Sequence, residues 1–331
     1  MKKILSALAI VSVLFVPLFA NGKQEQKGTV TGNGPYEVKF STENGAEDVE
    51  TKALMEIKDI LNKSGKFKVE VFIGGALGEN DDTLEQAIQG APIVTVSDPG
   101  RLMSFVNAYG IIQMPYFIDD ISVVNRLMDT DIYKNWEEQF ESQGIKLLTS
   151  NWYSGPRNFI LNKEVHQPSD LKGQKIRTIA SPLFTESVNA MGAVATPMSW
   201  TEVYSGIEQK AIDGCEAQTP TSYASHLWEI CKYTNKTEHF QLIGCPCIGT
   251  TTFNSWDTEA QNLFVQTFRD IGKKYQALVL NMIEEEEKEM AGKGMVFVQV
   301  DKTPFKKAVE PVYEKLDYTD LKEQLVKELV L

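Results

Sequence analysis

The sequence lacks the residue patterns on which most hydrolytic enzymes and nucleic-acid-binding proteins depend. Only three histidines occur among 331 residues, and neither GxSxG nor HExxH is present, so no nucleophile–base motif or catalytic zinc motif can be recognised. Basic residues form no cluster after residue 20, and the formal net charge of the chain is −12. This acidic balance argues against nucleic acid and anionic membrane surfaces as partners.

Cysteine is also scarce. The four cysteines are Cys215, Cys231, Cys245 and Cys247. A disulfide between the last two would be strained, because a single residue separates them. Adding His239 gives His-x5-Cys-x-Cys, which lacks the paired CxxC spacing of a structural zinc site. We therefore expect buried thiols, no metal and no cofactor.

The N-terminus carries an apolar run, MKKILSALAIVSVLFVPLFA. Two lysines before this run and a small residue, Ala20, at its end are typical of a secretory signal. Residues 21–34 are rich in Gly, Gln and Lys and predict a flexible leader. Later apolar runs are too short to cross a bilayer. We therefore expect export to the periplasm, and removing 20 of 331 residues leaves 311, enough for two domains.

Strand and helix patterns alternate along the rest of the chain, which predicts an α/β protein. In the first half we expect strands at 36–43, 66–73 and 91–98 and helices at 46–63 and 81–89, forming a mainly parallel sheet. Ligands bind such sheets at the carboxyl ends of the strands. The loops at those ends carry Glu43, Glu79 and Asp98.

A second α/β unit begins near residue 155. We expect strands at 157–162, 174–180, 194–198 and 211–217 and helices at 182–191 and 200–210, with a further helix that contains Tyr223, Leu227 and Trp228. Ser199 and Glu202 have the spacing of a capping box at the start of the 200–210 helix. Apolar residues from 258 to 289 recur at alternating fours and threes, which predicts one long amphipathic helix.

Arginine is rare, with five residues against a large excess of lysine. Arg157 follows a Ser-Gly-Pro turn, and Arg177 interrupts an apolar strand. Arginine binds a carboxylate through two parallel hydrogen bonds and stays charged when desolvated. Composition alone leaves two interpretations open for both residues: an anion-binding cleft or a structural salt bridge.

Three segments resemble one family. Residues 170–217, DLKGQKIRTIASPLFTESVNAMGAVATPMSWTEVYSGIEQKAIDGCEA, together with GGALGENDDTLEQAIQGAPIVTVSDPGRL and QMPYFID upstream, are similar to the solute-binding proteins of tripartite ATP-independent periplasmic (TRAP) transporters, the DctP-like family. The resemblance implies a two-lobed periplasmic-binding-protein-like α/β fold, a ligand cleft between the lobes and a long bridging helix. The implied lobes are 35–154 with about 243–282, and 155–242 with about 283–331.

The resemblance also implies site residues. Arg177 corresponds to the main carboxylate-clamping arginine, Arg157 to a second basic residue directed at the ligand, and Trp200 to an aromatic that packs on the ligand. Four residues correspond to first-lobe positions that reach polar ligand groups: Glu43, Glu79, Asp98 and Arg101.

The chain departs from the family after Asp-Gly-x-Glu. Many members place an asparagine there, whereas this chain has Ala217 followed by Gln218. Loss of that amide argues against a sugar-acid or sialic-acid ligand, unless the longer Gln218 replaces it. Alternatively, the small Ala217, with Trp152, Trp200 and Tyr223 nearby, could leave room for an aromatic or branched acid. Ordinary core packing is the other interpretation of these aromatic residues.

We therefore expect a monomeric binding protein, not an enzyme, that captures a small organic acid and delivers it to the permease subunits of a TRAP transporter. Two alternatives stay open from the sequence: an exported enzyme that acts on an organic acid, and a ligand-sensing subunit of a signalling receptor.

Overall fold

The computed structural model describes residues 35–329, and the predicted signal sequence and leader lie outside this range. The described residues form one ten-stranded sheet. Its strands are β1 (Tyr36–Ser41), β2 (Phe67–Phe72), β3 (Ile93–Ser97), β4 (Ile145–Leu147), β5 (Trp152–Leu161), β6 (Lys175–Thr178), β7 (Val194–Pro197), β8 (Gly214–Gln218), β9 (Tyr233–Gly249) and β10 (Val296–Gln299).

The parallel pairing predicted for the strands of the first half is confirmed, but the complete sheet is mixed. Strands β2, β1 and β3 are parallel at one end, and β8, β6 and β7 are parallel at the other. Between them, β9 pairs antiparallel with β3, β4 and β5, and β5 pairs antiparallel with β8. Since β9 is 17 residues long, it joins the two parallel units into one continuous sheet.

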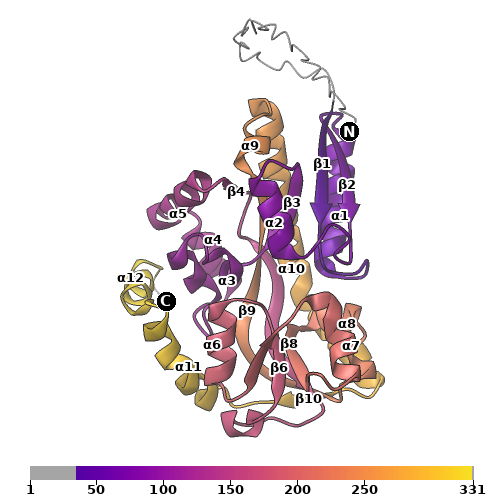
Figure 1. The fold of residues 1–331 in the computed structure, drawn as a ribbon, viewed down its shortest axis with the longest axis vertical. Helices are drawn as coiled ribbons and strands as arrows, with labels where there is room; N and C mark the ends of the chain where they lie inside the picture. Colours follow the sequence, from indigo (N-terminus) through magenta and orange to yellow (C-terminus); the bar gives the residue numbers. More distant parts are fainter. Residues whose placement is uncertain (1–34, 330–331) are drawn as a thin grey trace, which may run out of the picture. The chain divides into compact units, whose positions relative to one another are not determined.

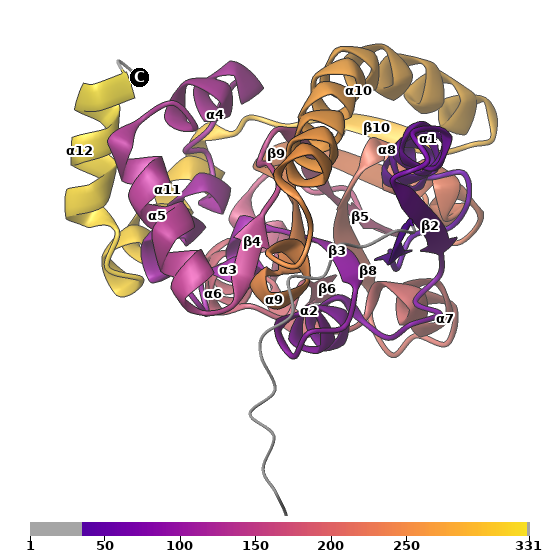
Figure 2. The same cartoon turned by 90° about the horizontal axis from the view of Figure 1, so that it is seen from above.

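The helices that surround the sheet are α1 (Val49–Lys63), α2 (Asn80–Ile88), α3 (Pro99–Leu102), α4 (Ile121–Leu127), α5 (Asp131–Ser142), α6 (Pro182–Ala190), α7 (Val203–Glu208), α8 (Thr219–Ala224), α9 (Thr250–Phe253), α10 (Thr258–Gly292), α11 (Thr303–Lys315) and α12 (Thr319–Leu329). Short 3₁₀ helices cover Asn107–Gln113, Pro168–Leu171, Trp200–Glu202 and Leu227–Glu229. Figure 2 shows α1 and α10 on one side of the strands and α2 and α6 on the other.

The predicted long helix is confirmed by α10, whose 35 residues extend over about 50 Å. Its first half buries Phe264 and Phe268 in an apolar cluster with β1, β2 and α1. Its second half buries Met290 in a different cluster, with β8 and α7. The helix therefore crosses from one core to another, along the sheet that β5 and β9 hold together (Figure 1).

We call the part built around β1–β4 the first lobe and the part built around β6–β8 the second lobe. The exact division of the chain between lobes stays a prediction. The two C-terminal helices pack on different lobes: α11 packs on α6, whereas α12 packs on α4 and on the 3₁₀ helix Asn107–Gln113. The C-terminal segment thus runs from one lobe to the other.

Two predicted helices are shorter than expected. The 200–210 segment begins as a 3₁₀ turn and becomes α7 only at Val203, and the Ser199 hydroxyl bonds Thr201 Oγ1 instead of capping the helix. The capping-box prediction was therefore wrong. The helix predicted to contain Tyr223, Leu227 and Trp228 is interrupted at His226, whose φ of 56° lies in the left-handed region.

The four cysteines are buried and none is in a disulfide, which confirms the expectation of buried thiols. Burial raises the pKa of each thiol, so these sulfurs are unreactive near neutral pH. No helix among residues 35–329 has the length and apolarity needed to cross a membrane.

We predict that Phe264→Ala in α10 lowers the free energy of unfolding by about 3–5 kcal/mol, because it opens a cavity in a packed aromatic cluster. Phe264 contacts the rings of Phe40, Phe67 and Trp256. Urea denaturation followed by circular dichroism measures this change. Leu280→Ala on the same helix is the control, since Leu280 is 58% exposed and its truncation should change stability by less than about 0.5 kcal/mol.

Candidate functional site

A cavity lies between the lobes, at the carboxyl ends of β1 and β3. Its volume is about 80 Å³, counted as the space that the centre of a water molecule can occupy. This is room for several waters or part of a small organic molecule. Its lining is largely polar or charged: Thr42, Glu43, Asn44, Glu50, Asn80, Val96, Ser97, Asp98, Arg101, Ser154, Arg157, Arg177, Ile179, Trp200, Gln218, Thr221, Leu242, Ile243 and Gly244. Both lobes contribute, so closing them encloses the cavity.

Arg177 is a buried cation that has no counter-ion among residues 35–329. It lies on β6 between β7 and β8 and is only 2% exposed. Its Nε donates to the Met198 carbonyl at 2.8 Å, and its guanidinium lies 5.2 Å from the Trp200 ring centroid. Within residues 35–329, no carboxylate lies within 4.0 Å of it, and its two terminal nitrogens have no hydrogen-bond partner. Both nitrogens are therefore free to bind a ligand in the cavity.

The electrostatics of Arg177 favour an anion. Burial, reinforced by the nearby Arg157 charge, lowers the pKa of Arg177 to about 10. The guanidinium is still protonated at neutral pH, although its desolvation is uncompensated. An anion at its terminal nitrogens would offset that cost with two charge-assisted hydrogen bonds.

Arg157, on β5, is held by the protein itself. Its Nε and Nη2 donate to the two carboxylate oxygens of Glu216, and Nη2 also donates to the Glu216 carbonyl at 2.7 Å. Its Nη1 donates to Gln218 Oε1 at 3.0 Å. Thr178 donates a further hydrogen bond to Glu216 at 2.7 Å. Most hydrogen bonds of Arg157 are therefore made to Glu216, as in the structural salt-bridge interpretation. The side chain nevertheless lines the cavity.

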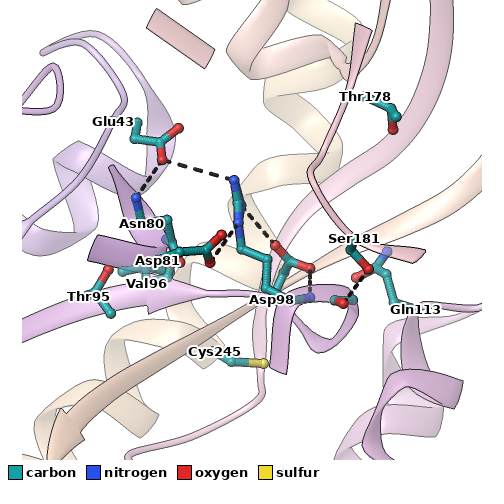
Figure 3. Close-up of polar contacts among 12 residues, drawn as sticks. Glu43, Asn80, Asp81, Thr95, Val96, Asp98, Gln113, Thr178, Ser181 and Cys245 are labelled. Carbon is teal, nitrogen blue, oxygen red and sulfur yellow. Dashed lines mark hydrogen bonds and ion pairs between the residues drawn. The ribbon is translucent and has the colours of Figure 1, made fainter. Parts of the chain in front are cut away.

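Arg101, at the end of α3, lies among three carboxylates, those of Glu43, Asp81 and Asp98, which are labelled in Figure 3. Its nitrogens lie 3.3 Å from Asp98, 3.4 Å from Asp81 and 4.0 Å from Glu43. Glu43 also accepts from the backbone N–H of Asn80 at 2.7 Å. The first-lobe side of the cavity therefore carries more negative than positive charge, whereas the side of Arg177 is positive.

A chain of hydrogen bonds crosses from one lobe to the other beside the cavity. Gln218 Nε2 donates to Thr221 Oγ1 at 2.5 Å, and the Thr221 hydroxyl donates to Asp48 Oδ2 at 2.7 Å. Asp48 also caps α1 by accepting from the Glu50 N–H. This chain links Arg157 on β5 to the N-terminus of α1 in the first lobe.

A second interlobe contact joins α3 to α6. Ser181, which caps α6, donates its hydroxyl to the Gly100 carbonyl. A Cβ atom at Gly100 would lie 2.4 Å from Cε2 of Phe184, which is shorter than any normal contact. The lobes approach this closely because residue 100 has no side chain.

The structure brings seven of the ten predicted site residues to the cavity: Glu43, Asp98, Arg101, Arg157, Arg177, Trp200 and Gln218. The other three are not in its lining. Ala217 is on the opposite face of β8, in an apolar cluster with Cys215. Trp152 stacks on Phe268 and donates to the Phe268 carbonyl. Glu79 precedes α2.

Sequence reasoning missed several lining residues, among them Glu50, Thr221, Asn80 and Ser154. Glu50 is in the first turn of α1 and was indistinguishable from a favourable helix-start acid. Thr221 follows Gln218 by one turn of α8, and this spacing was the one signal that could have found it.

Two α/β lobes around a charged cavity to which both contribute are the architecture of a ligand-closing binding protein. Residues 40–319 match the family described as bacterial extracellular solute-binding protein, family 7. A periplasmic protein of Escherichia coli named for 2,3-diketo-L-gulonate binding is 25% identical over 80% of each chain.

Two solved TRAP solute-binding proteins are each 30% identical to this chain, and each match covers 88% of this chain and 99% of theirs. The protein of Actinobacillus succinogenes, solved with L-galactonate, has a TM-score of 0.84. The protein of Escherichia fergusonii, solved empty and open, has a TM-score of 0.76. The present structure is thus more similar to the ligand-bound neighbour than to the open one.

This chain belongs to the bacterial extracellular solute-binding proteins of family 7, the solute-binding components of TRAP transporters. Members of this family bind solutes and are not enzymes, so the exported-enzyme alternative was wrong.

We predict that Glu216→Gln lowers the free energy of unfolding by about 3–5 kcal/mol, because it leaves the Arg157 charge buried and unpaired. Chemical denaturation at pH 7 measures the change. Glu186→Gln is the control, since its pair with Lys315 is on the surface and contributes about 0–1 kcal/mol. Equal effects of the two substitutions would contradict the structural importance of the Arg157–Glu216 pair.

Proposed function

We propose that this protein captures a small hydroxylated monocarboxylate in the cavity between its lobes and delivers it to the permease subunits of a TRAP transporter. One observation carries the proposal: the buried guanidinium of Arg177 has no counter-ion within residues 35–329 and lines the cavity. A buried charge without a partner is costly. The ligand's carboxylate supplies the missing partner.

The charge distribution supports one carboxylate, not two. Arg157 is neutralised by Glu216, and Arg101 is outnumbered by Asp98, Asp81 and Glu43. A second ligand carboxylate at the first-lobe end would approach these acids and be repelled. Dicarboxylates therefore fit this cavity less well than monocarboxylates.

The neutral polar groups support a hydroxylated chain. Thr42, Asn44, Asn80, Ser97, Ser154, Gln218 and Thr221 line the cavity, and Glu43 and Asp98 can accept hydrogen bonds. Sugar-acid hydroxyls act both as donors and as acceptors, so they match such a lining. Two relatives are associated with six-carbon acids of this kind, L-galactonate and 2,3-diketo-L-gulonate.

An aromatic or branched acid has less support, because Trp152 and Ala217 are absent from the lining and Trp200 alone contributes an aromatic ring. That ring lies over the Arg177 guanidinium. We propose that Trp200 holds the guanidinium in place and shields the ligand's carboxylate from water.

Closure couples binding to delivery. A ligand that contacts both lobes stabilises the closed state by its extra affinity for that state, and the closed surface is what a permease can recognise. In this proposal the signal sequence places the protein in the periplasm, and it acts as a monomer.

We predict that Arg177→Lys weakens binding of the preferred sugar acid at least about 100-fold, because an ammonium cannot form two parallel hydrogen bonds with a carboxylate. Isothermal titration calorimetry measures the affinity. Arg126→Lys is the matched control: Arg126 lies on α4, where it bonds the Leu329 carbonyl, and its replacement should leave affinity unchanged. Unchanged affinity in Arg177→Lys would remove this residue from the site.

We also predict the outcome of a thermal-shift screen. A hexonate or uronate, tested as L-galactonate, L-fuconate and D-glucuronate, should stabilise the protein more than succinate or malate does. A specific ligand at 100 times its Kd adds about 2.7 kcal/mol of stability. A flat response to every acid, or a preference for C4 dicarboxylates, would contradict the proposed ligand class.

A further inference from the structure

Two carboxyl groups at the start of α1, beside the cavity, have no ion-pair partner among residues 35–329. Asp48 is 1% exposed, and Glu50 is partly buried with its accessible surface in the cavity lining. Within residues 35–329, neither has an ion pair within 4.0 Å. The Thr42 hydroxyl donates to Glu50 Oε1 at 2.5 Å, whereas Glu50 Oε2 has no hydrogen-bond partner in the same range of residues.

The charged groups around this pair are mostly acidic. Glu43 faces Glu50 from the loop after β1, and Glu286 faces Asp48 from α10. Two cations are near: Arg101, which is shared among Asp98, Asp81 and Glu43, and Lys52, which pairs with Glu47 at 3.4 Å. The cations are therefore committed elsewhere, and two adjacent buried carboxylates would repel each other.

This carboxyl pair is also part of the closed interface. Asp48 accepts the hydrogen bond from Thr221 that crosses between the lobes. Opening the lobes would break that bond and expose the cavity side of Glu50 to water. Water stabilises the ionised carboxylate, so opening the lobes should lower the pKa of the pair and release the proton.

We propose that the Asp48–Glu50 pair is a proton-binding site that fills when the lobes close, so that the ligand's anion is captured together with one proton from solvent. This inference rests on the proposed function, since the ligand drives the closure. The proton resides on the carboxyl that lines the cavity, Glu50, where its free Oε2 becomes a hydrogen-bond donor toward a ligand oxygen.

The pKa directions agree with this assignment. Burial, followed by the repulsion of Asp48, raises the pKa of Glu50 to about 8, and burial raises that of Asp48 as well. Burial also raises the pKa of Glu286 to about 7. In the hydrated open form the pKa of the Glu50 carboxyl should return toward its ordinary value near 4.5. Between those limits the closed form binds more protons than the open form, so closure is favoured at lower pH.

Calorimetry with L-galactonate as the probe tests the proposal. Titrations at pH 7 in phosphate, HEPES and Tris differ in buffer ionisation enthalpy, so the slope of the observed enthalpy against that quantity counts the protons exchanged. We expect uptake of nearly one proton per bound ligand. Affinity should fall by up to about tenfold per pH unit between pH 6 and 7.5 and level off above pH 9. Binding heats that do not depend on the buffer would overturn the proposal while leaving the proposed function intact.

Two variants assign the proton. Glu50→Gln keeps the side-chain shape and the Thr42 contact, and it should bind L-galactonate with little proton uptake and a flat pH profile. Glu186→Gln on α6, where Glu186 pairs with Lys315 at the surface, should behave like the unmodified protein. Undiminished proton uptake in Glu50→Gln would show that the proton binds elsewhere.

If L-galactonate gives no heat, the acid that stabilises the protein most in the thermal-shift screen replaces it in these titrations. A ligand-free measurement then tests the open form, in which Glu50 is hydrated and its pKa should lie near its ordinary value. The difference in unfolding midpoint between Glu50→Gln and the unmodified protein should therefore stay constant between about pH 5 and 8. A difference that grows with pH in the absence of ligand would overturn the proposal, because Glu50 would then bind its proton before the lobes close. Absence of binding by every acid in the screen would instead count against the proposed function.

Discussion

The buried guanidinium of Arg177 is the constraint on which the site depends. It is fixed at Nε by the Met198 carbonyl and covered by Trp200, yet its terminal nitrogens have no protein partner among residues 35–329. The protein could have satisfied this group as it satisfies Arg157, with a carboxylate from β8. It does not, so the desolvation cost of the Arg177 charge is offset only when an anionic ligand binds.

The remaining charges around the cavity confine the attraction for an anion to the end at which Arg177 lies. The Arg157–Glu216 pair is neutral, while Asp98, Asp81 and Glu43 around Arg101 make the first-lobe end negative. The cavity thus has a direction, and a ligand with one anionic end and one hydroxylated end matches it. Because the two ends belong to different lobes, orienting the ligand and closing the lobes are the same event.

Much of this organisation could be predicted from the sequence because it is local. The 3.6-residue period gave α10, the alternation of strands and helices gave the α/β class, and Arg177 stood out against its apolar neighbours. The antiparallel pairing of β9 could not be predicted, since strand partners far apart in sequence leave no local mark. For the same reason Arg157 and Glu216, 59 residues apart, could be identified as a pair only in the folded structure. Glu50 and Ala217 illustrate a third limit: which face of an element meets the cavity depends on the packing of the opposite lobe.

The contact between Gly100 and Phe184 is a position at which the distance between α3 and α6 in the closed state can be changed. Gly100 lies where α3 meets α6, next to Asp98, and is not among the residues that line the cavity. A graded series of side chains there would set the gap between the lobes in steps of single atoms. Affinity and release could thereby be adjusted mechanically, with ligand recognition left unaltered, which makes this position suited to building reporters whose working range is matched to a chosen solute concentration.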